Sequence, residues 1–94
     1  MTTEVTDNPE LSRYEVVVDG RPAGHAEYVL RGDQVVFTHT EVSSDFEGQG
    51  VGSALARGAL DDVRAKGRTV VPRCPFIRAW IDKHPQYGDL VVAA

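Results

Sequence analysis

Three glycines stand where the sequence changes from a strand-like to a helix-like pattern. The stretch "VSSDFEGQGVGSALARGALDDVRAKG", residues 42–67, has glycine at positions 48, 50 and 52. The first turn of a helix carries unpaired N–H groups and the positive end of the helix dipole, so a loop that curls over it can hold a phosphate or pyrophosphate. Glycine lets the backbone approach the oxygens and adopt positive φ. The same residues would equally serve a tight turn and a close helix–sheet contact.

The two best-known nucleotide loops do not fit this segment. A P-loop needs Gly-Lys followed by Ser or Thr, which is absent. The G-x-G-x-x-G pattern is not met either, because Gly48-Gln49-Gly50 is followed by glycine at 52 and serine at 53. The spacing alone therefore leaves a phosphate site and a simple turn both open.

One amphipathic helix follows the glycines. Apolar side chains recur at every fourth residue between 51 and 66, and Leu60 widens the stripe. Gly67 is a natural C′ residue, so we expect the helix to end there.

The residues before the loop indicate three strands of an antiparallel meander. Residues 13–19, "RYEVVVD", are rich in β-branched side chains and end in Asp19-Gly20, a strong hairpin signal. Residues 22–30 and 34–42 form the next two predicted strands, separated by a turn at Gly32-Asp33.

Pairing across the second turn predicts the register of these two strands. We expect Tyr28 opposite Phe37, which places apolar beside apolar. The same register puts Ala26 opposite His39.

The end of the chain predicts a short strand and a second helix. "RTVVP", residues 68–72, is a buried strand, and Pro75 suits the first turn of a helix that His84-Pro85 ends. Phe76, Ile77, Trp80 and Ile81 would share one side of it, and residues 90–92 could add a last strand. The fold class is α/β with a mixed sheet: a β-meander, then helix, strand and helix, with the two strands on either side of the first helix parallel.

Length and composition indicate one small, mildly acidic domain. Residues 11–94 form the domain, and residues 1–10 form a flexible N-terminal tail. The net charge of −4 and the lack of a basic helix face argue against nucleic acid. With no membrane-length apolar run and no secretory signal, we expect no membrane partner and a cytoplasmic location. One cysteine and three scattered histidines do not predict a metal site.

The loop and its flanks resemble the GNAT N-acetyltransferase superfamily. In that family a strand ends in valine, and a Gln/Arg-x-x-Gly-x-Gly/Ala signature opens the main helix; here the match is Val42 and residues 47–52, "EGQGVG". "FTHTEV" and "VVPRCPFIRAWIDKHPQY" are similar to the small single-domain Yjdj-type members, so the resemblance covers nearly the whole chain. It implies a GNAT acyl-CoA N-acyltransferase fold, acetyl-CoA as co-substrate and an amine as acceptor.

The resemblance also implies which residues hold CoA. Backbone amides from Gly48 to Ser53 would bind the pyrophosphate, and residues 40–42 would pair with the pantetheine arm like an added strand. Glu47 departs from the signature, because a carboxylate beside a diphosphate is unfavourable unless it points outward. The implied cofactor-binding residues are Thr40, Val42, Glu47, Gly48, Gln49, Gly50, Val51, Gly52, Ser53, Cys74 and Tyr87.

His39 and Glu41 are the candidates for acid–base chemistry. They stand two residues apart on one strand, so they share a face and could together deprotonate an incoming ammonium. We predict His39 as general base, aided by Glu41. The alternative is a core histidine under the helix and a solvated charge at the strand end.

Cys74 is the third catalytic candidate. It precedes a helix, where a thiolate is favoured. By the resemblance it lies beside the CoA arm, where it could orient the thioester, protonate the leaving thiolate or take the acetyl group. Burial as a small apolar residue is the alternative. Tyr87 is a further candidate acid, unless it packs against Trp80.

The sequence runs from a short polar segment straight into strands, so the resemblance implies an open acceptor site, suited to an exposed protein or peptide amine. We predict an N-acetyltransferase that acts by direct attack, of weak activity, as a monomer or weak dimer. The first alternative is a non-catalytic acyl-CoA-binding or regulatory module of the same fold. The second is a structural domain whose loop binds nothing.

Overall fold

The first half of the chain forms four antiparallel strands in chain order. In the computed structural model, which describes residues 2–92, these are β1 Thr3–Asn8, β2 Arg13–Val18, β3 Arg21–Arg31 and β4 Gln34–Val42, with a 3₁₀ turn, η1 Pro9–Leu11, after β1. Asp19 and Gly20 both have positive φ, 50° and 81°, between β2 and β3. The predicted hairpin turn is confirmed.

The second half adds the helices and one strand. The elements are η2 Ser44–Phe46, α1 Val51–Ala65, β5 Thr69–Pro72, α2 Pro75–Lys83 and η3 Pro85–Leu90. Strand β5 pairs in parallel with β4, which completes a five-stranded sheet in the order β1-β2-β3-β4-β5. The predicted α/β fold with a mixed sheet is confirmed.

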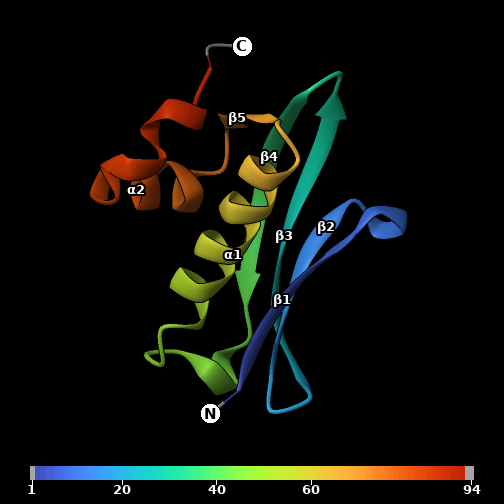
Figure 1. Cartoon of the computed structure of the whole chain (residues 1–94). Helices are drawn as coiled ribbons and strands as arrows, with labels where there is room; N and C mark the ends of the chain where they lie inside the picture. Colours follow the sequence, from blue (N-terminus) through green and yellow to red (C-terminus); the bar gives the residue numbers. More distant parts are fainter. Residues whose placement is uncertain (1, 93–94) are drawn as a thin grey trace.

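Both helices cover the same face of the twisted sheet (Figure 1). Helix α1 buries its predicted stripe, from Val51 through Leu55 to Val63, against the strands, and α2 buries Ile77 and Trp80 in the same core. The aromatic rings of Tyr14, Tyr28 and Phe37 fill the middle of that core. Within residues 2–92, the opposite face of the sheet carries no helix.

Helix α1 ends as predicted at Gly67. Gly67 has a φ of 68°, its N–H donates to the carbonyl of Arg64, and the next N–H, of Arg68, donates to the carbonyl of Val63. This is the Schellman pattern, which pairs the last carbonyls of the helix and requires a left-handed residue at C′.

The prediction of a flexible tail at residues 1–10 is wrong for residues 3–8. These residues form β1, which pairs with β2 over six positions, from Thr3 opposite Val18 to Asn8 opposite Arg13. The strand has a polar composition because one of its faces is exposed and it lies at the edge of the sheet.

The predicted register of β3 and β4 holds only to Tyr28 and Phe37. A bulge at Thr38 places an extra residue in β4, so His39 pairs with Glu27, and Ala26 pairs with Thr40. Strict alternation from the buried Phe37 would point His39 into the core. The bulge turns it to the opposite face.

Two smaller expectations also change. Phe76 lies at the edge of the α2 stripe and is 40% exposed. Instead of a strand at 90–92, Leu90 ends η3, and Val91 makes a single bridge to Val70.

Within residues 2–92, no helix is long and apolar enough to cross a membrane.

Candidate functional site

Strands β4 and β5 separate halfway along β4. Pairing stops at Phe37, whose carbonyl accepts from the N–H of Cys74 at 2.9 Å, and the chain then turns into α2. Residues 38–42 of β4 therefore have no strand on that side in the described part of the chain. This free edge is where the family resemblance expects an extended ligand to add like a strand.

The glycine loop has the backbone conformation that the sequence predicts. Gly48 and Gly50 have φ of 77° and 75°, and Gly50 is the N-cap of α1. A Cβ at either position would meet no atom within 4 Å, so glycine is required there by the backbone conformation and not by crowding. The tight turn is confirmed.

Several amides at this turn have no backbone acceptor among the described residues. The N–H groups of Glu47 and Gln49 already donate to the carbonyls of Ser44 and Phe46, both at 3.3 Å. Within residues 2–92, the amides of Gly48 and Gly50 have no backbone partner, and residues 51–53 carry the unpaired N–H groups of the first helical turn. The loop can therefore donate several hydrogen bonds to an anion.

Gly52 serves packing instead of the turn. A Cβ there would lie 2.9 Å from Cζ of Phe76 and 3.5 Å from Cγ2 of Val42. The first turn of α1 thus fits closely against α2 and the end of β4. The hydroxyl of Ser53 accepts a hydrogen bond from Nε1 of Trp80 at 2.9 Å, so its side chain joins the two helices.

His39 and Glu41 lie together on the open face of the sheet. Nε2 of His39 is 2.9 Å from Oε1 of Glu41, and the His39 side chain is 53% exposed. The alternative of a core histidine is therefore wrong. Because a carboxylate only accepts, a neutral His39 carries its proton on Nε2 and leaves Nδ1 free to take another. The hydrogen bond that His39 donates to Glu41 raises the pKa of His39 above its ordinary value and lowers the pKa of Glu41.

Thr40 and Cys74 meet on the other side of the same strand. Oγ1 of Thr40 lies 3.2 Å from Sγ of Cys74, which is buried and is the N-cap of α2. The predicted set is thus divided by β4, with His39 and Glu41 on one face and Thr40 and Cys74 on the other.

Tyr87 is held away from both groups. Its hydroxyl donates to Oδ1 of Asp61 at 2.7 Å, and its ring packs 5.2 Å from Trp80. Burial and the hydrogen bond to Asp61 raise the pKa of Tyr87. Asp61 lies eight positions after Ser53 on α1, about 12 Å along the axis, so Tyr87 is separated from the glycine loop.

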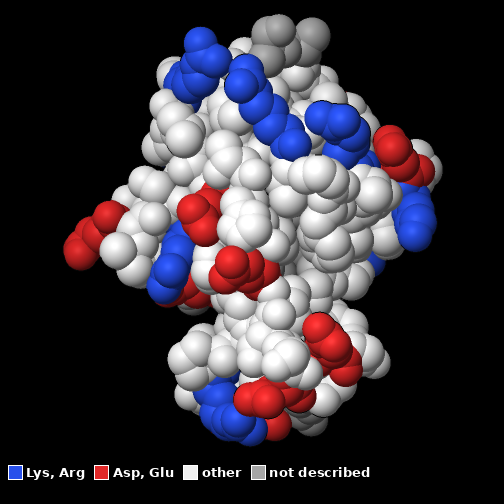
Figure 2. All heavy atoms as spheres, turned by 180° about the vertical axis from the view of Figure 1, so that it is seen from behind, with Lys and Arg blue, Asp and Glu red and all other residues white. Residues whose placement is uncertain are grey.

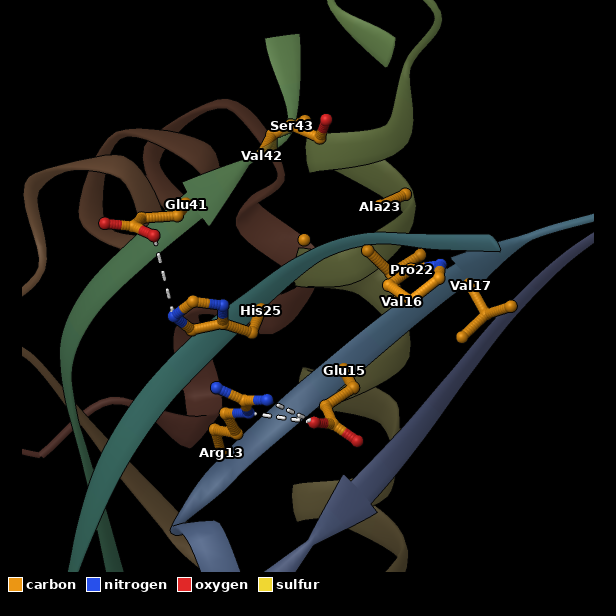
Figure 3. A pocket seen from close by; sticks show the side chains of 11 residues that line it. Arg13, Glu15, Val16, Val17, Pro22, Ala23, His25, Glu41, Val42 and Ser43 are labelled. Carbon is orange, nitrogen blue, oxygen red and sulfur yellow. Dashed lines mark hydrogen bonds and ion pairs between the residues drawn. The ribbon is translucent and has the colours of Figure 1, made fainter. Parts of the chain in front are cut away.

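A cavity of about 500 Å³ also opens beside Glu41. It lies over β2, β3 and the end of β4, and no pattern in the sequence indicates it. Figure 3 shows His25 and Glu41 pointing toward one another and Arg13 paired with Glu15. The open face around it carries carboxylates over its middle and lower part, with Lys and Arg more numerous toward the upper end (Figure 2).

Two solved structures are similar to this chain. A GCN5-like candidate N-acetyltransferase from Staphylococcus aureus, determined by NMR, has a TM-score of 0.72 at 19% identity, over 97% of this chain and 89% of that one. The crystal structure of the ribosomal-protein-S18-alanine N-acetyltransferase from Escherichia coli has a TM-score of 0.58 at 22% identity, over 62% of this chain and 38% of that one. At these identities the likeness shows the fold alone.

The sequence profile of the GCN5-related N-acetyl-transferase family matches residues 13–90, which run from the start of β2 to the end of η3. No curated protein matches the chain. Because the profile spans most of the chain and includes the glycine loop, His39, Glu41 and Cys74, the protein belongs to the GCN5-related N-acetyltransferase family.

Proposed function

We propose that the protein binds acetyl-CoA and transfers its acetyl group to a primary amine. The observation that carries this proposal is the free edge of β4 leading to the left-handed glycines at 48 and 50 and the unpaired amides of residues 51–53. A diphosphate fits this turn, because donors and the helix dipole converge where the glycine backbone leaves room. Glu47 and Gln49 would contact the ligand only through their exposed side chains, since their amides are already paired.

We infer that His39 and Glu41 prepare the acceptor. Nδ1 of His39 takes a proton from the ammonium, and the freed amine nitrogen attacks the acetyl carbonyl carbon. The CoA thiolate leaves, and the nitrogen gives its second proton to solvent as the amide forms. Glu41 keeps the imidazole in the tautomer that leaves Nδ1 free and stabilises the imidazolium that forms. Cys74, held by Thr40 at the free edge of β4, orients the thioester and supplies a proton to the departing sulfur.

The finer assignments are part of the same proposal. The motifs "FTHTEV" and "VVPRCPFIRAWIDKHPQY" support membership of the small Yjdj-type group. The uncovered sheet face supports an exposed acceptor such as a protein or peptide amine. A cytoplasmic location and a monomeric or weakly dimeric state complete the proposal.

Calorimetric titration with acetyl-CoA and with CoA tests the ligand. Wild type should bind both, and Gly50→Ala should bind each at least about tenfold more weakly, because a residue other than glycine at positive φ costs about 1–2 kcal/mol and moves the amides of the turn. Gly20→Ala is the matched control. Its φ is 81° with no atom within 4 Å of a Cβ, so it should lose similar stability and keep wild-type affinity.

Undiminished affinity in Gly50→Ala would show that the loop does not hold the ligand.

Turnover separates an enzyme from a binding module. With any amine that the wild type acetylates, His39→Ala and Cys74→Ala should both reduce turnover, and His39→Ala should leave CoA affinity unchanged. If both variants keep full turnover, the catalytic assignment is wrong. CoA binding without acetylation of any amine in a broad panel would leave only a binding module.

A further inference from the structure

The cavity beside Glu41 combines an apolar wall with a charged rim. Val17 and Pro22 contribute the side chains of the apolar part, and Glu15 and His25 stand at the rim. The opening exists because β3 has an extra residue, Ala23, where the register shifts between Val16 and Val17 of β2.

Gly24 brings β4 close to this bulge. A Cβ at position 24 would lie 2.5 Å from the carbonyl oxygen of Glu41 and 3.1 Å from Cα of Val42. No larger residue fits there without moving the backbone of β4. The rim at Glu41 and the wall on β2 and β3 are therefore held in a fixed relation.

The rim has an excess of negative charge. Glu27 lies 3.1 Å and Glu41 3.9 Å from Nε2 of His25. Glu27 itself does not line the cavity, whereas Glu15 does, and the only ion pair of Glu15 in the described residues is with Arg13 at 2.8 Å. Two carboxylates of the lining, those of Glu15 and Glu41, thus face one guanidinium. A cation that enters the cavity is attracted, and an anion is repelled.

Glu41 connects this cavity with the proposed transfer site. It lines the cavity and hydrogen-bonds His39, and its neighbour Thr40 contacts Cys74 on the other face of the strand. An amine held at Glu41 is beside the predicted base. The apolar wall extends from there, away from the free edge of β4.

We propose that this cavity is the acceptor subsite, and that it takes an ammonium carried on an unbranched apolar chain, as in a lysine side chain. This inference rests on the proposed function. The ammonium donates to the carboxylate of Glu41, beside His25, and the methylene chain lies along Val17 and Pro22. Glu15 raises the affinity for the cation from the rim, and Arg13 lowers it.

The probe is Nα-acetyl-lysine methylamide, and its norleucine analogue, which lacks the ammonium, is the comparison ligand. In ¹⁵N spectra of the protein without acetyl-CoA, the lysine probe should shift the amides of residues 15–17 and 24–25. The norleucine analogue should shift them less at the same concentration. This readout needs no turnover, and equal shifts from both ligands would overturn the preference for a cation.

Acetylation of the same probe gives the second measurement. Val17→Phe fills the wall and should raise the KM for the lysine probe about tenfold, with the KM for acetyl-CoA unchanged. Val29→Phe is the matched control, because Val29 is exposed on β3 outside the cavity. It should leave both KM values at the wild-type level.

Two charge variants test the same subsite without filling the cavity, so their effect does not depend on how the larger side chain of Val17→Phe packs. Glu15→Gln should raise the KM for the lysine probe about threefold, and Arg13→Gln should lower it by a similar factor. Both effects should shrink in high salt. A change of the same sign in both variants would contradict the assignment.

The two proposals fail in different ways. If the wild type acetylates the lysine probe but Val17→Phe and Glu15→Gln leave its KM unchanged, the subsite is wrong and the transferase stands. If acetyl-CoA binds but the lysine probe causes no shifts and is not acetylated, the subsite is again wrong. If acetyl-CoA does not bind at all, the proposed function fails, and the subsite inference fails with it.

Discussion

At the scale of residues, the arrangement of His39 and Glu41 depends on one extra residue. The sequence predicts correctly that the two side chains share a face, because they are two positions apart on a strand. It could not tell which face, because the bulge at Thr38 breaks the alternation that starts at Phe37. The same bulge decides that Thr40, and not His39, lies on the face with Cys74. Neither alternation nor spacing carries a signal for it.

Glycine positions were easier to predict than the cavity. Gly48 and Gly50 predict a turn with left-handed residues, because few residues other than glycine adopt positive φ. His25 and Glu15 carry no such signal, since a polar residue in an alternating strand is most simply an exposed one. Their approach to Glu41 follows from the bulge at Ala23 and from Gly24, and both are visible only in three dimensions.

The hydrogen bond between His39 and Glu41 predicts a shift in the pH profile of acetylation. Glu41 raises the pKa of His39 by bonding its protonated form, so wild-type kcat/KM should rise with pH through that raised pKa as the base loses its proton. Glu41→Gln removes the charge and lowers the pKa of His39. The acid limb should therefore move to lower pH, together with a lower maximum.

A pH series of kcat/KM with the lysine probe makes this measurement. Glu4→Gln, an equivalent change on exposed β1, is the control and should leave the limb in place. His39→Ala should lack the limb altogether. An unshifted limb in Glu41→Gln would mean that another group titrates there.

At the scale of elements, β1 is the strand that the sequence analysis does not predict. Its pattern is weak because only Val5 is apolar among its six residues, and edge strands need little more. The complementary signal lies far away in α1. Gly58 stands in the middle of the helix, where glycine is unfavourable, and a Cβ there would lie 2.6 Å from Cβ of Val5. The missing side chain of one element makes room for the apolar residue of the other.

This contact reverses the usual effect of a glycine-to-alanine change in a helix. In an open helix Gly58→Ala would stabilise by about 1 kcal/mol through helix propensity. Here it should lower the free energy of unfolding by about 1 kcal/mol or more, because the new methyl group and Val5 cannot share the space.

The double variant Val5→Ala/Gly58→Ala should recover most of that loss, and Val5→Ala alone should be destabilising through the lost contact. Urea unfolding of the three variants gives the coupling energy directly. Additive effects of the two substitutions would place β1 away from α1, contrary to the structure.

At the scale of the whole molecule, one polar network joins three strands to the main helix. The Tyr14 hydroxyl donates to Asp62 at 2.7 Å, and the Tyr28 hydroxyl donates to Asp7 of β1. Lys66 bridges the two carboxylates, at 2.8 Å from Asp62 and 3.0 Å from Asp7. Burial and these carboxylates raise the pKa of both tyrosines, so both hydroxyls remain donors over the whole ordinary pH range. The network connects β1, β2 and β3 to the C-terminal end of α1, which is the end farthest from the glycine loop.

The network makes the stability of the fold depend on pH through Asp62. Burial alone would raise the pKa of Asp62, but hydrogen bonds from Lys66 and Tyr14 and the charge of Arg68 outweigh it, so the pKa is lowered. A carboxylate with a lowered folded pKa stabilises the protein above its unfolded pKa, about 4, and loses that contribution as the pH falls through the folded value. Asp62→Asn should therefore lower the free energy of unfolding by roughly 1 kcal/mol at pH 7, and the two proteins should converge in stability once the pH falls below the lowered folded pKa of Asp62. Urea unfolding at a series of pH values measures this, with Glu4→Gln as the control that should follow wild type throughout. A constant difference between wild type and Asp62→Asn down to the lowest pH would show that the side-chain shape, and not the charge, holds the helix to the sheet.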